Sequence, residues 1–187
     1  MSASDLFQGS LVRLTALTAE DLPTLVRWYQ DAEFLRLFDS RPAYPKTEPE
    51  LKDWLEELRK DKDTFAFGIR LLESDDLIGY LEVDGIDWQH GACGMGLGIG
   101  DQDDWGKGYG LEATQLGLGY AFNELNLHRV TITIFDYNER SMALAKKAGF
   151  QREGVSRERL QRDGARRDML WYGLLRHEWE AESKGIQ

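Results

Sequence analysis

The spacing of apolar residues predicts helices in the first third of the chain. Apolar side chains recur every three to four positions over 22–29 and again over 51–58, which is the period of an amphipathic helix. A threonine, Thr18 or Thr47, stands before each segment with an acidic residue three positions later, as in a capping box. A shorter helix is expected over 31–38, between the two.

From residue 64 onward, the pattern is that of strands interrupted by two helices. The expected strands are 64–72, 77–86, 93–100, 129–135, 151–161 and 165–175, with a further short one at 11–14. The expected helices of this part are 108–126 and 138–148. This order predicts an α+β fold with a mixed sheet covered by helices, because a doubly wound sheet would alternate throughout. We expect one domain over 1–187, with its core at 10–176.

The net charge, the cysteine count and the apolar runs of the sequence limit which partners and compartments we expect. The net charge of −10 argues against a nucleic-acid partner, which would require a basic excess. It is compatible with a cationic substrate, although an acidic balance commonly serves solubility alone. The single cysteine, Cys93, leaves no internal disulfide and favours a reducing compartment. No apolar run approaches the roughly 18 residues of a membrane helix, and residues 1–10 lack signal-peptide features, so we expect a cytoplasmic protein without a membrane partner.

The most informative motif is the glycine-rich run Trp-Gly-Lys-Gly-Tyr-Gly at 105–110. It follows an apolar strand and precedes a helix, so free backbone N–H groups converge there, as a bound phosphate requires. The spacing does not match a nucleoside-triphosphate loop, because the lysine is followed by a third glycine. Gly108, Gly110 and Ala113 match a dinucleotide fingerprint, but they lie partly inside the expected helix and outside any series of parallel strands.

The same run resembles the acetyl-CoA pyrophosphate loop of the GNAT superfamily of N-acetyltransferases. Residues 138–150 resemble the next motif of that superfamily, and 78–79 and 95–101 fit its upstream pieces. The resemblance covers essentially the whole chain and is nearest to the branch with ribosomal-protein N-terminal and spermidine acetyltransferases. It implies a central mixed, mostly antiparallel sheet and acetyl-CoA as cosubstrate. The three histidines share no ligand spacing, so no metal is expected.

The resemblance also implies a set of cofactor-binding residues. These are Leu97, Gly98, Ile99, Gly106, Lys107, Gly108, Tyr109, Gly110 and Asn138. Within this set, the amides of 106–110 would hold the pyrophosphate and the strand residues would pair with the pantetheine arm. The N–H of Leu97 or Gly98 would stabilise the oxyanion of the tetrahedral intermediate. Asn138 would bond the cofactor, cap the following helix, or do both.

Two side chains are expected to move protons. Ser141 is the candidate that protonates the leaving thiolate, because Ala145 stands where many members of the superfamily have a tyrosine. The general base is open, because Gly94 stands where many relatives have a glutamate. Carboxylates on or just after the neighbouring strand could take that role directly or through water. The candidates are Asp84, which we rank first, Glu82 and Asp87.

Two functions are compatible with these residues. The first is an acetyl-CoA-dependent N-acetyltransferase, in which a primary amine attacks the thioester directly in a ternary complex. The second is a non-catalytic CoA-binding sensor or interaction protein. The acceptor would be an amine-bearing small molecule or a protein N-terminus, held between the early helices and the last hairpin, and a homodimer is compatible with either function. The aromatic residues expected to wall the acceptor site, or else to lie in the core, are Trp28, Tyr29, Phe34, Phe38 and Tyr44.

Overall fold

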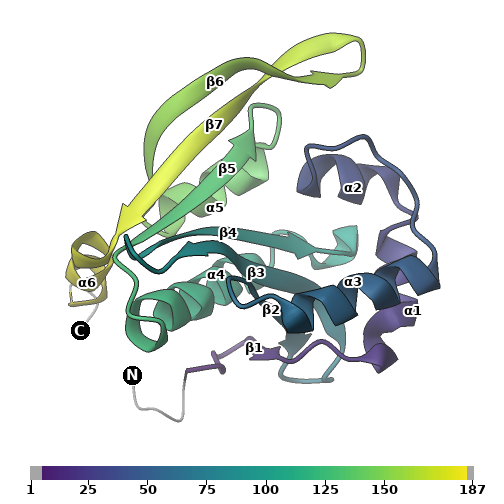
Figure 1. Cartoon of the computed structure of the whole chain (residues 1–187), viewed down its shortest axis with the longest axis horizontal. Helices are drawn as coiled ribbons and strands as arrows, with labels where there is room; N and C mark the ends of the chain where they lie inside the picture. Colours follow the sequence, from purple (N-terminus) through teal and green to yellow (C-terminus); the bar gives the residue numbers. More distant parts are fainter. Residues whose placement is uncertain (1–5, 185–187) are drawn as a thin grey trace.

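The computed structural model describes residues 6–184 and contains one seven-stranded sheet in the order β1-β2-β3-β4-β5-β7-β6 (Figure 1). The strands are β1 Val12–Thr15, β2 Phe65–Leu71, β3 Leu77–Asp87, β4 Ala92–Ile99, β5 Arg129–Phe135, β6 Gln151–Arg162 and β7 Ala165–Leu175. Only β4 and β5 pair in parallel, and every other neighbouring pair is antiparallel. The expectation of a mixed, mostly antiparallel sheet is therefore confirmed.

Helices cover the sheet where the apolar periodicity predicts them. The α-helices are α1 Leu22–Trp28, α2 Ala32–Phe38, α3 Glu48–Lys60, α4 Tyr109–Gly119, α5 Glu139–Lys147 and α6 Arg176–Lys184, and two 3-10 turns are η2 Ala19–Asp21 and η3 Gln102–Asp104. Both expected capping boxes form: the N–H of Thr18 donates to Asp21, and that of Thr47 donates to Glu50, each over 2.8 Å. These caps fix where η2, which leads directly into α1, and α3 begin. Helix α3 lies beside β2 and β3 (Figure 1).

Two helical predictions need correction. The segment 108–126 is not one regular helix, because α4 ends at Gly119 and a π-helical turn, η4 Tyr120–Glu124, follows. In that wide turn the N–H of Leu125 donates to the carbonyl of Tyr120 over 3.0 Å, five residues back. Helix α6 was not expected, because its charged sequence carries a single large apolar anchor, Trp179, whose ring lies 5.3 Å from that of Phe122. The contact of Trp179 with Phe122 holds this helix to the fold, and its sequence has no apolar periodicity that would predict it.

The sequence predicts neither a membrane-spanning helix nor a signal peptide. Among the helices of residues 6–184, none combines the length and apolar character that a membrane crossing requires. The expectation that no signal peptide occupies 1–10 depends partly on residues 1–5, which lie outside the described residues.

Strand β4 separates two environments. On one face β4 and its neighbour β3 pack against α4 so closely that a Cβ added at Gly117 would lie 2.8 Å from Leu81 Cδ1 on β3 and 3.2 Å from Met95 Cε on β4. Near the start of α4, a Cβ on Gly110 would lie 3.6 Å from Leu97 Cδ1. The opposite face carries Gly94, Gly96 and Gly98 of β4, followed by Gly100 directly after the strand. Side chains alternate along a strand, so this glycine face turns toward α1 and α2.

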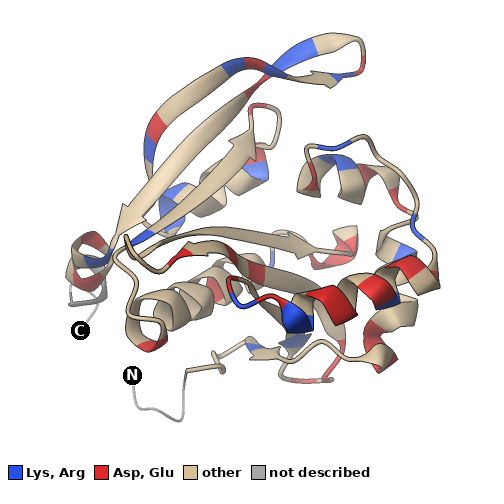
Figure 2. Ribbon diagram, viewed as in Figure 1, with Lys and Arg blue, Asp and Glu red and all other residues tan. Residues whose placement is uncertain are grey.

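The charge is distributed unevenly over the fold (Figure 2). Five exposed carboxylates lie on α3: Glu48, Glu50, Asp53, Glu56 and Glu57. Basic residues instead recur along β6 and the hairpin that joins it to β7 (Figure 2). Because α3 also carries Lys52, Arg59 and Lys60, its net charge is only −2, and the total of −10 does not describe the charge of any one region, including the cavity considered next.

Candidate active site

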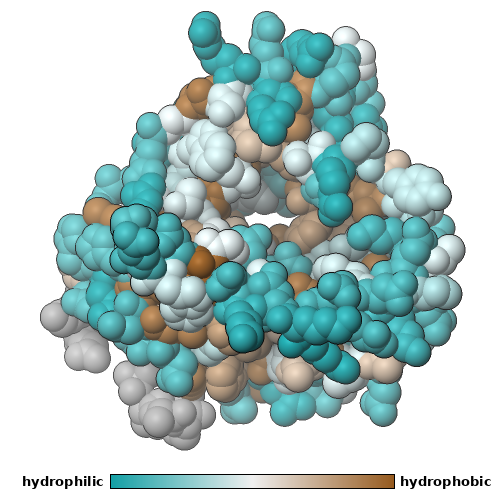
Figure 3. Space-filling view, in the orientation of Figure 1, coloured by the Kyte–Doolittle hydropathy of each residue, from teal (hydrophilic) through white to brown (hydrophobic). Residues whose placement is uncertain are grey.

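The central feature is the point at which β4 and β5 part. The two strands pair only where Ala92–Gly94 faces Arg129–Thr131, and beyond that they diverge (Figure 1). The space between them belongs to a cavity of about 1020 Å³, whose opening is visible near the middle of the face in Figure 3. This volume is at the upper end of the range for small-molecule sites. Residues from β3, β4, β5, β7, α2, α4 and α5 line it.

Parting the strands leaves backbone groups of β4 without a strand partner. The N–H of Gly100 donates to the carbonyl of Ile78 on β3 over 2.9 Å, and hydrogen bonding alternates along an antiparallel pair. The backbone of Gly98 therefore faces β3, whereas the backbone of Leu97 and of Ile99 faces the cavity. The carbonyl of Ile99 is already used, because it accepts the indole N–H of Trp105 over 2.9 Å.

The glycine-rich loop lies at the end of this cavity, against the start of α4. Gly106 and Gly108 have φ of +76° and +93°, a region that glycine enters without strain. Gly108 is the N-cap of α4, and Gly106, Gly108, Tyr109 and Gly110 all line the cavity. The Lys107 side chain instead contacts Asp104, with 3.2 Å between Nζ and Oδ1. The loop therefore offers backbone donors and a helix N-terminus to an anion.

Trp105 packs at this loop through two contacts. One contact is its hydrogen bond to Ile99, and the other is the Arg140 guanidinium, which lies 3.9 Å from the centre of its ring. Arg140 comes from the first turn of α5, and its other partner is Glu33 on α2 at 3.7 Å. Trp105 thus connects the loop to β4 and to α5.

Asn138 and Ser141 both line the cavity at the start of α5. Asn138 is the N-cap, and its Oδ1 accepts the N–H of Ser141 over 3.1 Å. The helix-capping role expected for Asn138 is confirmed. A hydrogen bond from Asn138 to the cofactor stays a prediction.

Two carboxylates of β3, Glu82 and Asp84, reach the cavity from the same face of the sheet. The Asp84 carboxylate occupies the place that a Cβ on Gly94 would take, so a larger residue at 94 would collide with it. Burial of the carboxyl group raises the pKa of Asp84. Burial, followed by the charge of Asp84, raises the pKa of Glu82 to about 7. The pKa of Glu82 thus lies near neutral pH, where a general base is effective.

Cys93 is next to these carboxylates but is not a nucleophile. Burial, with the charge of Asp84 as the second cause, raises the pKa of its thiol to about 12. At neutral pH the side chain stays a protonated thiol, which is a weak nucleophile. Cys93 is therefore a buried residue of β4 and not a reactive thiol.

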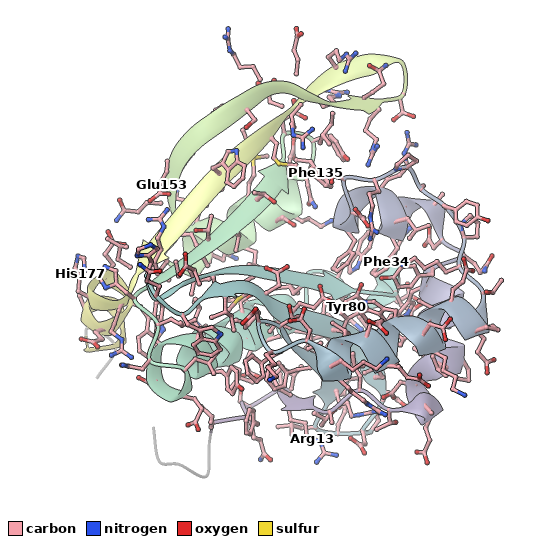
Figure 4. The ribbon with its side chains drawn as sticks, in the orientation of Figure 1. Arg13, Phe34, Tyr80, Phe135, Glu153 and His177 are labelled. Carbon is pink, nitrogen blue, oxygen red and sulfur yellow. The ribbon has the colours of Figure 1, made fainter. Side chains whose placement is uncertain are left out.

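The aromatic residues expected around the acceptor divide into two groups. Phe34 and Phe38 on α2 line the cavity, with their rings stacked at 5.5 Å. Trp28 and Tyr29 lie in the core and do not border the cavity, whereas Phe34, only 2 % exposed, belongs to that core and also borders the cavity. Tyr44 is 68 % exposed. Figure 4 shows Phe34 on one side of the open space and Phe135, which also lines the cavity, on the other.

The β6–β7 hairpin closes the site above α2. Arg162 donates from Nη2 to the carbonyls of Asp39 and Arg41 over 2.9 and 3.0 Å, and Asp163 pairs with Arg36 at 2.5 Å. These contacts hold the end of α2 against the hairpin, which fixes the wall that carries Phe38. The sequence offered no sign of them, because their partners lie more than 120 positions apart.

Within the part of the chain that the structure describes, no three His, Cys, Asp or Glu side chains are grouped so that they could hold a metal ion.

Known proteins are similar to this chain in sequence and in fold. An uncharacterised N-acetyltransferase from the SPbeta prophage of Bacillus subtilis, YokL, is 30% identical over 172 residues, which is 92% of this chain and 94% of that protein. The [ribosomal protein uS5]-alanine N-acetyltransferase of Escherichia coli is 27% identical over 75% of this chain and 73% of its own length. The spermidine N-acetyltransferase of Vibrio cholerae, solved with CoA and spermine, shares the fold with a TM-score of 0.84 at 22% identity, covering 92% of this chain and 99% of that one. The acetyltransferase (GNAT) domain matches residues 12–151, and the chain therefore belongs to the GNAT family of N-acetyltransferases.

Proposed function

We propose that the protein transfers the acetyl group of acetyl-CoA to a primary amine by direct attack in a ternary complex. One observation carries the proposal. One cavity receives the edge of β4 at Leu97 and Ile99, which has no strand partner there, the glycine loop at the start of α4 and two carboxylates of β3. Since the relatives are named N-acetyltransferases, an enzyme is favoured over a non-catalytic CoA-binding protein.

The cofactor-binding proposal covers Leu97, Gly98, Ile99, Gly106, Lys107, Gly108, Tyr109, Gly110 and Asn138. The N–H groups of the loop and the N-terminus of α4 suit the pyrophosphate, and Lys107 contributes its backbone while its side chain stays with Asp104. The strand edge suits the amide groups of the pantetheine arm. Of the two oxyanion donors expected from the sequence, alternation favours Leu97, because its N–H faces the cavity.

The proton transfers are assigned to β3 and α5. The pair Glu82 and Asp84 removes a proton from the substrate ammonium, and the neutral nitrogen then attacks the thioester carbonyl carbon. As the C–N bond forms and the C–S bond breaks, Ser141 supplies a proton to the departing thiolate. The nitrogen then releases its second proton to solvent. The serine hydroxyl regains its proton from solvent. Asp84 takes its part as a direct base or by raising the pKa of Glu82 through its own negative charge. Holding both substrates together supplies much of the rate.

The acceptor proposed here is an amine-bearing small molecule or a protein N-terminus, with no nucleic-acid partner. The compartment proposed is the cytoplasm. A homodimer is also proposed, and sedimentation of the full chain would test it.

Replacing Gly108 by valine tests the cofactor site. A side chain at φ +93° is strained and would crowd the amides that face the pyrophosphate. We expect acetyl-CoA binding, measured by calorimetry, to weaken by about 100-fold or more, with thiol release lost in proportion. A wild-type protein that binds acetyl-CoA but releases no thiol with any amine would overturn the enzyme proposal.

A further inference from the structure

The four glycines on one face of β4 have different surroundings. A Cβ on Gly94 would meet the Asp84 carboxylate, and one on Gly98 would lie 2.8 Å from Phe38 Cδ2 and 3.0 Å from Phe34 Cε2. A Cβ on Gly100 would overlap the Trp28 ring. At Gly96, no atom lies within 4 Å of that position. The glycine face is thus covered on both sides of Gly96 and bare at Gly96, and we call this bare position the Gly96 notch.

The Gly96 notch lies within the reaction cavity. Gly96 lines that cavity and is the residue before Leu97, whose N–H faces the strand gap. Its cross-strand partner is Glu82, and cross-strand partners point to the same face of a sheet. Among the described residues, no donor forms a hydrogen bond with the Glu82 carboxylate. A carboxylate without a donor therefore borders the one bare position of the strand.

We propose that Gly96 determines the acceptor: the acetyl-accepting nitrogen lies over Gly96, and the enzyme selects primary amines carried on an unbranched CH₂ carbon. This inference rests on the proposed function and adds the substrate class to it. Alternate residues on one face of a strand are about 7 Å apart, and the positions on either side of Gly96 are filled by Asp84 and by Phe38. An ammonium on a methylene fits between them, whereas a substituent on that carbon meets one or the other.

The chemistry of the walls suits such an amine. Glu82 and Asp84 attract the ammonium from the β3 side. The Phe38 ring, which stacks on the buried Phe34 ring, offers an apolar surface to the methylene chain that follows the nitrogen. Arg41 carries the opposite charge on this side of the cavity but is paired with Asp39 at 2.5 Å.

Replacing Gly96 by alanine fills the notch without strain, since its φ is not in the left-handed region and no atom lies near the new Cβ. The matched control is Gly154→Ala, on β6, where a Cβ is equally free and the residue lies outside the cavity lining. Thiol release is measured with two matched pairs of amines, glycinamide with alaninamide and n-butylamine with sec-butylamine, and with spermidine. Thermal melting and calorimetry with acetyl-CoA report folding and cosubstrate binding.

We expect wild-type protein to favour the unbranched member of each pair by about 10-fold or more in kcat/KM. G96A should lose about 10-fold or more on every amine that the wild-type protein acetylates, with unchanged melting and acetyl-CoA affinity. G154A should match the wild type throughout.

Three results would overturn the inference while the proposed function stands: full activity of G96A, equal use of branched and unbranched amines, or a loss of acetyl-CoA affinity in G96A that accounts for its lost activity. A wild-type protein that acetylates none of these amines while binding acetyl-CoA would overturn the proposed function itself, and the inference with it.

Discussion

Strand β4 is filled to contact on its α4 face and left open at one position of its other face. On the α4 face, Gly117 is a glycine because Leu81 and Met95 leave no room for a side chain. On the other face, Gly96 has no neighbour within 4 Å of a Cβ. Glycine thus stands at these two positions for different reasons: close packing at Gly117 and open space for a reaction at Gly96. Substitutions on the α4 face should therefore change stability, and those on the cavity face should change activity.

Replacing Glu82 by glutamine on the open face should have the largest effect. The amide keeps the shape of the side chain but cannot accept the ammonium proton. We expect kcat/KM for the best amine to fall by about 100-fold or more while acetyl-CoA affinity is unchanged. Steady-state thiol release and calorimetry would measure the two quantities.

Glu73→Gln, in the exposed turn between β2 and β3, is the matched control and should behave as the wild type. If Asp84→Asn abolished activity and Glu82→Gln retained it, the base would be Asp84, as ranked first from the sequence. Loss in both variants would indicate that the pair acts as a unit.

The same carboxylate should make stability depend on pH. Burial and the neighbouring Asp84 raise the pKa of Glu82 from 4.5 to about 7, while Lys46 and Arg41 oppose the shift and Asp39 adds to it. The folded state therefore binds more protons than the unfolded state between pH 4.5 and 7, and the free energy of unfolding falls as pH rises through this window. The loss attributable to Glu82 is about 3 kcal/mol. Urea unfolding at pH 5 and pH 8 should show this fall in the wild type and a smaller one in Glu82→Gln. Equal pH dependence in both proteins would contradict it.

On the filled face, Gly117→Val should destabilise the fold by about 1–3 kcal/mol, because the branched side chain must displace Leu81 and Met95. Gly119→Ala, two residues further along α4, is the control. No atom lies within 4 Å of its added Cβ, so the helix should gain up to about 1 kcal/mol. Thermal and urea unfolding measure both, and similar shifts for the two variants would show that α4 does not pack on β4 as described.

The cofactor half of the site could be predicted from sequence because it is built from backbone. Glycines that interrupt a strand–helix junction leave a mark in the sequence, and the run at 105–110 lies at the start of α4 as expected. The alternation of side chains along an expected strand likewise places Glu82 and Asp84, two positions apart, on one face of the sheet.

The acceptor half depends on contacts between distant segments. Sequence alone could not separate the two carboxylates, because their pKa values depend on how deeply each is buried. It could not divide the aromatic residues between the core and the cavity wall, because Trp28 and Phe38 both stand in expected helices. Nor did it separate Gly117 from Gly119, because only the packing of α4 on β4 distinguishes a close approach from open space.

The smallest expected effect is that of a substitution at Trp105, which joins the glycine loop to the edge of β4. Trp105→Phe removes the hydrogen bond to the Ile99 carbonyl but keeps an aromatic ring against Arg140. One such bond contributes about 1 kcal/mol, so acetyl-CoA affinity should fall by about 5-fold, because the glycine loop is no longer held at a fixed distance from the strand edge. Trp88→Phe is the matched control, since its exposed indole also donates one hydrogen bond, to Asp63 over 2.7 Å, outside the cavity. Calorimetry with acetyl-CoA separates the two. If Trp105→Phe bound as tightly as Trp88→Phe, the loop would be positioned by α4 alone, and the bond to Ile99 would serve only to satisfy a carbonyl that the parting of β4 and β5 leaves unpaired.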